Sequence, residues 1–195
     1  MKLYERLPDS ITVLGKRYRL DLDFRNVLRM MEILAQDDLI PEARVYLALK
    51  CVMRHPPRHP EPVFAALKAM LFPAHRGEAG PKLTSFEQDA DLIRAAFRQA
   101  YGIDLYRDRV HWMEFQALLS ALPEGSRYSE VLGIRARPMP AATKYNQAER
   151  EWLAKAKAAC ALEMSEDERQ RAYAEGVKSV FAGLLAWAEG SDGHG

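Results

Sequence analysis

The segment from residue 85 to residue 123 carries two successive helix patterns and constrains the fold more than any other part of the chain. Apolar side chains recur there at spacings of three and four, which places them on one face of a 3.6-residue helix. The first helix has Phe86, Ala90, Ile93, Phe97 and Tyr101 on this face, and the second has Trp112, Phe115, Leu119 and Leu122. The pattern predicts a helical hairpin that packs through aromatic rings.

Residues with strong preferences for helix ends mark the limits of this hairpin. Ser85 is expected to cap the first helix with its hydroxyl oxygen, and Gly102 to end it in the left-handed conformation. Asp108 is expected to cap the second helix, and Pro123 to close it, because proline cannot continue the hydrogen-bond pattern.

The N-terminal part alternates in the manner of two short strands, SITVL at 10–14 and KRYRLDL at 16–22, with Gly15 and Lys16 as the expected turn. Two strands alone are marginal in water, so the hairpin must pack on the helices or pair with another chain. An unpaired second strand would offer its backbone to a partner strand, which is one route to oligomers. A hairpin that only covers the helical core remains the alternative.

Three more helices are predicted between residues 23 and 72. Asp23 is expected to cap the first, and the others span about 41–53 and 61–72. Their inward residues are predicted to be Phe24, Val27, Leu28, Met31 and Leu34, then Val45, Leu49 and Val52, then Val63, Leu67, Met70 and Leu71.

The loop RHPPRHP at 54–60 holds His55 and His59, the first place to look for a metal site. Their spacing of four would put them on one helix face, but the intervening prolines forbid a helix. No zinc-spaced cysteine or carboxylate accompanies them, so we expect a solvated turn and no metal or other cofactor.

Acidic residues and one histidine in the central hairpin were the remaining candidates for chemistry. Glu87 and Asp91 share a helix face while Asp89 points away, so the three cannot converge on one ion, and they suit the positive end of the helix dipole. His111 lacks a nucleophile in any recognisable motif, and a local hydrogen bond at a helix start is expected instead. We therefore expect no catalytic residue and no enzymatic activity.

The C-terminal third contains three further predicted helices. Ser126 opens a short helix, an extended basic linker follows at 135–143, and a charged helix from Asn146 carries the apolar residues Trp152, Leu153, Ala156 and Ala159. A last helix, capped near Ser165, carries an apolar stripe that either closes the core or docks into a neighbouring subunit or client helix. This candidate partner-binding stripe consists of Tyr173, Val177, Phe181, Leu184 and Leu185.

Charge and composition limit the classes of partner. The chain has 28 Lys and Arg against 27 Asp and Glu, a formal net charge of +1, so no global field attracts nucleic acid or an anionic membrane. A nucleic-acid surface built from Arg54, Arg58, Arg135 and Arg137 ranks below the protein-binding alternatives. Cys51 and Cys160 are expected to be buried reduced thiols, which suits a reducing cytosol. Neither a signal peptide nor a membrane span is expected.

The block FEQDADLIRAAFRQAYGIDL followed by HWMEFQALLSALP resembles the bacteriophage gene product fifteen family, found in tail gene clusters of long-tailed phages and prophages. The flanking segments LPDSITVLGKRYRLDLDFRNVLRMMEIL and RYSEVLGIRARPMP extend the resemblance over roughly residues 7–162. No catalytic residue comes with this resemblance. It implies a role in tail building, as a tail assembly chaperone that binds the tape-measure protein in the host bacterial cytoplasm.

The overall expectation is a mostly α multi-helix bundle with a small N-terminal β-hairpin. Residues 1–162 would form the helical core domain, and 163–195 a C-terminal helix and disordered tail. Other tail proteins and further copies of the chain stay open as additional partners. The alternative function is a structural tail or head-to-tail component that is retained in the virion.

Overall fold

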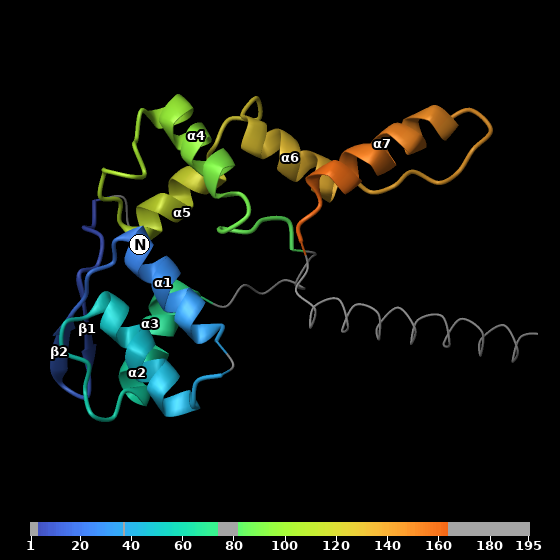
Figure 1. Cartoon of the computed structure of the whole chain (residues 1–195). Coiled ribbons are helices and arrows are strands. Elements are labelled where there is room, and N and C mark those ends of the chain that lie inside the picture. Colours follow the sequence, from blue (N-terminus) through green and yellow to red (C-terminus); the bar gives the residue numbers. More distant parts are fainter. Residues whose placement is uncertain (1–3, 37, 74–81, 164–195) are drawn as a thin grey trace, which may run out of the picture.

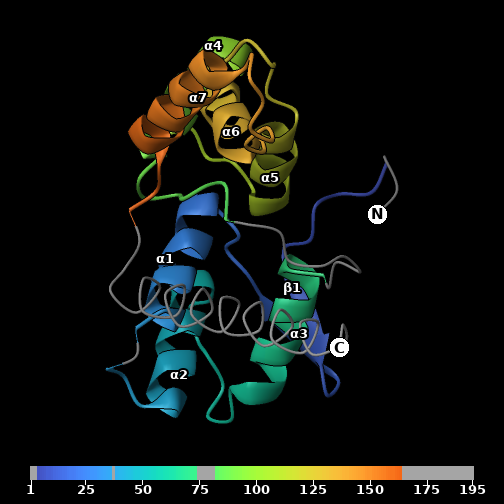
Figure 2. The same cartoon turned by 90° about the vertical axis from the view of Figure 1, so that its right-hand side faces the viewer.

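The computed structural model describes residues 4–36, 38–73 and 82–163, and in this part the chain is mostly helical with one two-stranded hairpin, which confirms the predicted fold class. The elements are β1 Ser10–Val13, β2 Lys16–Arg19, α1 Phe24–Leu34, α2 Pro41–Val52, α3 Glu61–Leu71, α4 Ala90–Tyr101, α5 Trp112–Ser120, α6 Arg127–Ala136 and α7 Gln147–Cys160. The hairpin and α1 to α3 lie at one end of the molecule, and α4 to α7 lie at the other (Figures 1 and 2).

Aromatic rings join the two ends, with Phe115 of α5 at their centre. Its ring stacks on Phe24 of α1 with centroids 4.7 Å apart and on Phe97 of α4 at 5.2 Å. Phe86 and Trp112 also contact it, at 6.0 and 5.8 Å. The predicted aromatic packing of the central hairpin is therefore confirmed, and the structure adds α1 to it.

Backbone hydrogen bonds fix how α1 and α5 begin beside one another. The Trp112 N–H donates to the Leu22 carbonyl at 2.7 Å, and the Phe24 N–H donates to the Val110 carbonyl at 2.9 Å. Arg25 adds two bonds at 2.8 Å each, to the carbonyls of Leu105 and Asp108. These bonds hold the N-terminal part of the chain against a segment more than 80 residues later.

The hairpin turn differs from the prediction by one residue. Its two central residues are Leu14 and Gly15, and Val13 pairs with Lys16, so Lys16 belongs to the strand. Both turn residues have positive φ, 50° and 75°, as the tight turns that fit the strand twist require. Leucine is rarely found in this conformation, which explains why the pattern favoured the wrong pair.

The first helix of the central hairpin starts later than predicted. Residues 86–89 form a turn, and α4 begins at Ala90 because the Asp89 carboxylate folds back to accept the Ser85 N–H at 2.9 Å. Ser85 caps only this turn, accepting from the Gln88 N–H at 3.3 Å. Gly102 ends the helix with φ 70°, as predicted.

The second helix also has a different cap. Asp108 accepts the Asp104 N–H at 2.8 Å, within the preceding loop, and His111 caps α5 by accepting the Met113 N–H at 3.2 Å. The helix ends at Ser120, before Pro123. The prediction of Asp108 as the cap was wrong because imidazole nitrogen is an uncommon capping acceptor.

Other predicted elements agree closely with the structure. Asp23 and Ser126 cap α1 and α6 through their side chains, as expected. In α7, Leu153 is fully buried, whereas Trp152 beside it in the sequence is 55 % exposed. Cys51 and Cys160 are free thiols and only half-buried.

A buried ion pair between Asp89 and Arg135 ties the second end together. The two guanidinium nitrogens lie 2.7 and 2.8 Å from the two carboxylate oxygens, and the side chains are 2 % and 11 % exposed. Thr84 approaches the same carboxylate at 3.4 Å, and its hydroxyl lies 2.9 Å from the Tyr128 hydroxyl. The four side chains form one polar cluster inside an apolar body.

Arg135 also reaches two backbone carbonyls. It donates to Leu83 at 2.9 Å and to Cys160 at 2.6 Å, while Lys157 donates to the Arg135 carbonyl at 2.7 Å. The arginine thus connects α6 with the start of α4, the segment before it and the end of α7. Burial acts to raise the pKa of Asp89, but the hydrogen bonds from Arg135 and from the Ser85 N–H outweigh it and hold the pKa below its ordinary value.

Replacing either member of this pair should destabilise the protein strongly. Because Asp89→Asn or Arg135→Met leaves the other charge buried and unpaired, we expect each to lower the free energy of unfolding by about 3 kcal/mol. The double variant should cost clearly less than the sum of the two, as measured by urea denaturation. Glu130→Gln, in the exposed Arg127–Glu130 pair, is the control and should change stability by less than ~0.5 kcal/mol. Additive effects would contradict this account.

The pair should also make stability depend on acid pH. The folded-state pKa of Asp89 is below its ordinary value, so its contribution is complete above about pH 4 and is lost as pH falls through the folded pKa. The free energy of unfolding of the natural protein should therefore fall more steeply than that of Asp89→Asn between about pH 5 and pH 2.5. Parallel curves in urea titrations over this range would exclude Asp89 as the source.

Candidate functional site

The predicted partner-binding stripe lies beyond the part of the chain that the structure describes. Its residues Tyr173, Val177, Phe181, Leu184 and Leu185 all follow residue 163. The stripe therefore stays a prediction, and the surfaces considered next belong to residues 4–163.

Within the described ranges, the histidines and acidic residues singled out in the sequence do not gather into a site. His55 and His59 are both exposed in the loop between α2 and α3, and no group of three metal-ligating side chains occurs among the described residues. Glu87 and Asp91 are exposed, whereas Asp89 is buried against Arg135. In His111 the Nδ1 atom accepts a hydrogen bond, so Nε2 carries the proton and donates to the Pro8 carbonyl at 3.1 Å.

The four arginines considered for nucleic acid do not form one surface. Arg135 is buried in its ion pair, and Arg137 binds Glu149 at 2.8 Å near α7. Arg54 and Arg58 lie in the loop after α2, at the other end of the molecule. Within the described ranges, no helix is both long and apolar enough to cross a membrane.

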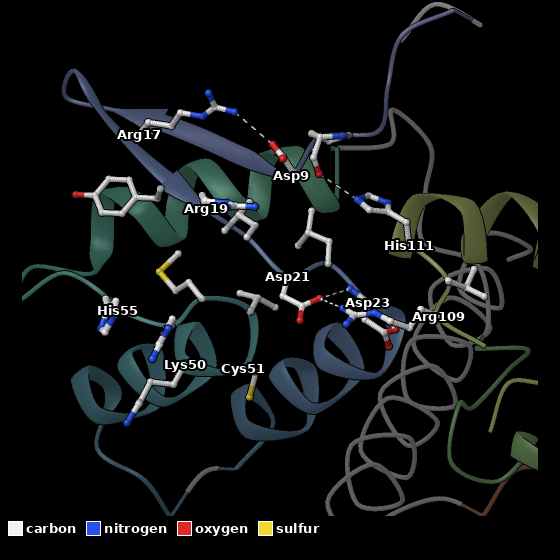
Figure 3. Close-up of a pocket in the computed structure, with 18 of the residues that line it drawn as sticks. Asp9, Arg17, Arg19, Asp21, Asp23, Lys50, Cys51, His55, Arg109 and His111 are labelled. Carbon is white, nitrogen blue, oxygen red and sulfur yellow. Dashed lines mark hydrogen bonds and ion pairs between the residues drawn. The ribbon is translucent and has the colours of Figure 1, made fainter. Parts of the chain in front are cut away.

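A hollow of the described part runs along β2, and we call it the β2 groove. Residues 8–9, 16–23, 50–55 and 109–111 line it, and its volume is about 1050 Å³. It lies between the hairpin, the C-terminal end of α2 and the residues that precede α5 (Figure 3). Three segments that are distant in sequence therefore form one surface.

Basic side chains dominate the charge of the β2 groove. Its lysines and arginines are Lys16, Arg17, Arg19, Lys50, Arg54 and Arg109, and its aspartates are Asp9, Asp21 and Asp23. Each aspartate is already paired: Asp9 with Arg17 at 3.4 Å, Asp21 with Arg109 at 2.6 Å, and Asp23 with Arg25 at 3.1 Å.

Four cations are left over in the groove. Lys16, Arg19, Lys50 and Arg54 form no ion pair with any residue that the structure describes, and all four are exposed. The groove therefore presents an excess of positive charge although the chain as a whole is nearly neutral.

On the outer edge of β2, some backbone groups have no hydrogen-bond partner among the residues that the structure describes. Val13 and Lys16 flank the two-residue turn as a hydrogen-bonded pair, and such pairs alternate along antiparallel strands. The N–H and C=O groups of Arg17 and Arg19 therefore point away from β1. The neighbouring bonds fit this alternation, because the Leu20 N–H donates inward to Asp9 and the Asp21 N–H donates outward to Val52, both at 2.7 Å.

A second candidate surface is the outer side of α2. Ile40, Tyr46 and Leu47 are 68 %, 39 % and 39 % exposed there, while Leu49 and Val52 on the inner side are fully buried. The helix is thus apolar on two sides, and only one of them faces the core. Beside α1 and α3, a smaller apolar pocket of about 240 Å³ is lined by Met30, Leu34, Phe64, Lys68 and Phe72.

Sequence reasoning predicted the open strand edge as a possibility but missed the groove. The signal that was available is the basic character of two segments, KRYR in β2 and KCVMRH at the end of α2. Nothing in their spacing shows that they meet, because the fold brings them together through the bond between Asp21 and Val52.

Comparisons with known proteins identify the family. No curated protein and no solved structure matches the chain. The family described as Bacteriophage Gp15 protein matches residues 3–162, which is most of the chain and agrees with the resemblance seen in the sequence. The chain therefore belongs to the Bacteriophage Gp15 protein family and is a phage protein of the tail region.

Proposed function

We propose that this protein is a tail assembly chaperone that binds the tape-measure protein in the host cytoplasm until the tail tube encloses it. It acts by covering apolar surface and not by catalysis. Family membership supports the tail role, and the exposed apolar side of α2 is the structural observation that carries the chaperone role.

The outer side of α2 has the chemistry that a helical client needs. Ile40 and Leu47 are seven residues apart, so they lie on one side of the helix, and Tyr46 is also exposed, about 100° round the helix axis from Leu47. A helix of a globular protein normally has one apolar side, which faces the core, whereas α2 also carries the exposed apolar side chains Ile40, Tyr46 and Leu47. Here the outer side is exposed, so an amphipathic client helix can pack against it.

The need for such a partner follows from the physical nature of the client. A tape-measure protein is long and helical, and its apolar stripes are exposed before the tube surrounds it. Large exposed apolar surfaces aggregate unless a partner covers them. A small helical protein bound in several copies along the chain meets this requirement.

Co-expression with the tape-measure protein of the same gene cluster tests the proposal. We expect the tape-measure protein to be soluble only with this partner and to purify as a complex that contains several copies of it, as measured by native mass spectrometry. No association, together with an insoluble tape-measure protein, would contradict the chaperone role.

Surface variants in the same experiment locate the contact. Ile40→Ser with Leu47→Ser removes apolar contact area and should weaken the complex by about tenfold or more. Tyr145→Ser is the matched control, because Tyr145 is 90 % exposed in the linker before α7. Val177→Glu with Phe181→Glu tests the predicted C-terminal stripe in parallel. If only the Val177→Glu and Phe181→Glu variant loses the complex, the client contact lies in the C-terminal segment and not on α2.

A further inference from the structure

We propose that the β2 groove binds an extended, acidic segment of a partner protein, which pairs with the outer edge of β2 as an added strand. This inference concerns a different surface from the apolar side of α2 and does not rest on the chaperone role. The groove combines two features, an open strand edge and an excess of positive charge.

The backbone of β2 sets the length and direction of the bound segment. Arg17 and Arg19 together offer two N–H and two C=O groups, which suit one short added strand. The turn at Leu14 and Gly15 limits this edge on one side, and the bond from Asp21 to Val52 closes it on the other. The edge therefore accepts about four residues of a partner, the length of β2 itself.

The side chains of the groove select acidic residues. In an antiparallel pair the residues opposite Arg17 and Arg19 point to the same face as these arginines, so carboxylates at alternate positions of the partner would meet them. Lys50, near the C-terminal end of α2, adds positive charge from across the hollow (Figure 3), and Arg54 in the loop that follows α2 also lines it. Arg19, Lys50 and Arg54 form no ion pair with any described residue, so an acidic segment can pair with them directly, whereas at Arg17 its carboxylate would compete with Asp9.

A second copy of the chain fits this edge poorly. Antiparallel pairing of β2 with itself about Tyr18 would place Arg17 of each chain opposite Arg19 of the other. Like charges directly opposite each other destabilise a sheet. The groove therefore favours a different chain with the opposite charge over self-association.

Nucleic acid is also a poorer match to this surface. Three aspartates stand among the cations of the wall and would face phosphates. Among the described residues that line the groove, Tyr18 is the only phenylalanine, tyrosine or tryptophan, and it is half-buried with the Lys16 ammonium 5.3 Å from its ring centre. Single strands are usually held by exposed aromatic platforms, which this groove lacks among its lining residues.

A peptide titration followed by NMR tests the proposal on the full chain. The probe is the blocked peptide TEVEVT, and the matched control is TKVKVT. With the acidic peptide, we expect the amide protons of Arg17 and Arg19 to shift downfield and exchange more slowly, because they gain hydrogen bonds. The amides of Tyr18 and Leu20, which point toward β1, should exchange as before.

Two sets of variants separate the contribution of side-chain charge to peptide binding from that of the backbone hydrogen bonds. Arg17→Glu with Arg19→Glu should weaken TEVEVT binding by about tenfold and strengthen TKVKVT binding. Lys144→Glu with Lys155→Glu, at exposed positions near and on α7, is the charge-matched control and should leave binding unchanged. Arg19→Pro removes the outward N–H and should bind about fivefold more weakly than Arg19→Thr, which keeps it. Amide spectra of each variant check that the hairpin is intact.

Several results would overturn the proposal. One is the absence of shifts at Arg17 and Arg19 in the natural protein at millimolar TEVEVT. Equal binding of the acidic and basic peptides is another. Tighter, steeply salt-dependent binding of a 12-nucleotide single strand at the same amides would make the groove a nucleic-acid site. None of these outcomes depends on whether the tape-measure protein binds.

Discussion

The ion pair between Asp89 and Arg135 is the interaction on which the arrangement of α4, α6 and α7 depends. The carboxylate shapes the turn that starts α4, and the guanidinium reaches the carbonyls of Leu83 and Cys160. Two buried charges are costly unless each is fully bonded, and here each satisfies the other. The pair is therefore structural, and it removes both residues from the candidates for metal or nucleic-acid binding.

The other end of the molecule is attached by different means. Rings around Phe115 and the backbone bonds between residues 22–24 and 110–112 hold α1, and with it α2, α3 and the hairpin, against α5. This attachment uses one side of the N-terminal elements. The outer side of α2 and the β2 groove stay open, so the two candidate binding surfaces lie at the same end of the molecule.

The fold class and most helices could be predicted because the helices have apolar faces of helical period and several have conventional end residues, such as Asp23, Ser126 and Gly102. The errors occur where a longer-range contact replaces a local preference. The Asp89 carboxylate was expected to interact with the positive end of the helix dipole, but it binds the guanidinium of Arg135, 46 residues away. His111 caps α5 in place of Asp108. The β2 groove could not be predicted from the sequence for the same reason, since its walls come from three segments that only the tertiary fold brings together. The stripe from Tyr173 to Leu185 lies outside the described residues, and its role stays a prediction.

The central claim is that this family member acts during tail assembly as a transient partner, and the protein content of particles tests it most directly. Quantitative mass spectrometry would compare infected cells with purified virions of the same phage. The chaperone account predicts a protein that is abundant in the cells, together with the unassembled tape-measure protein, and absent from mature particles. A fixed number of copies in every purified virion would contradict it and make the protein a retained structural component of the tail or of the head-to-tail connection.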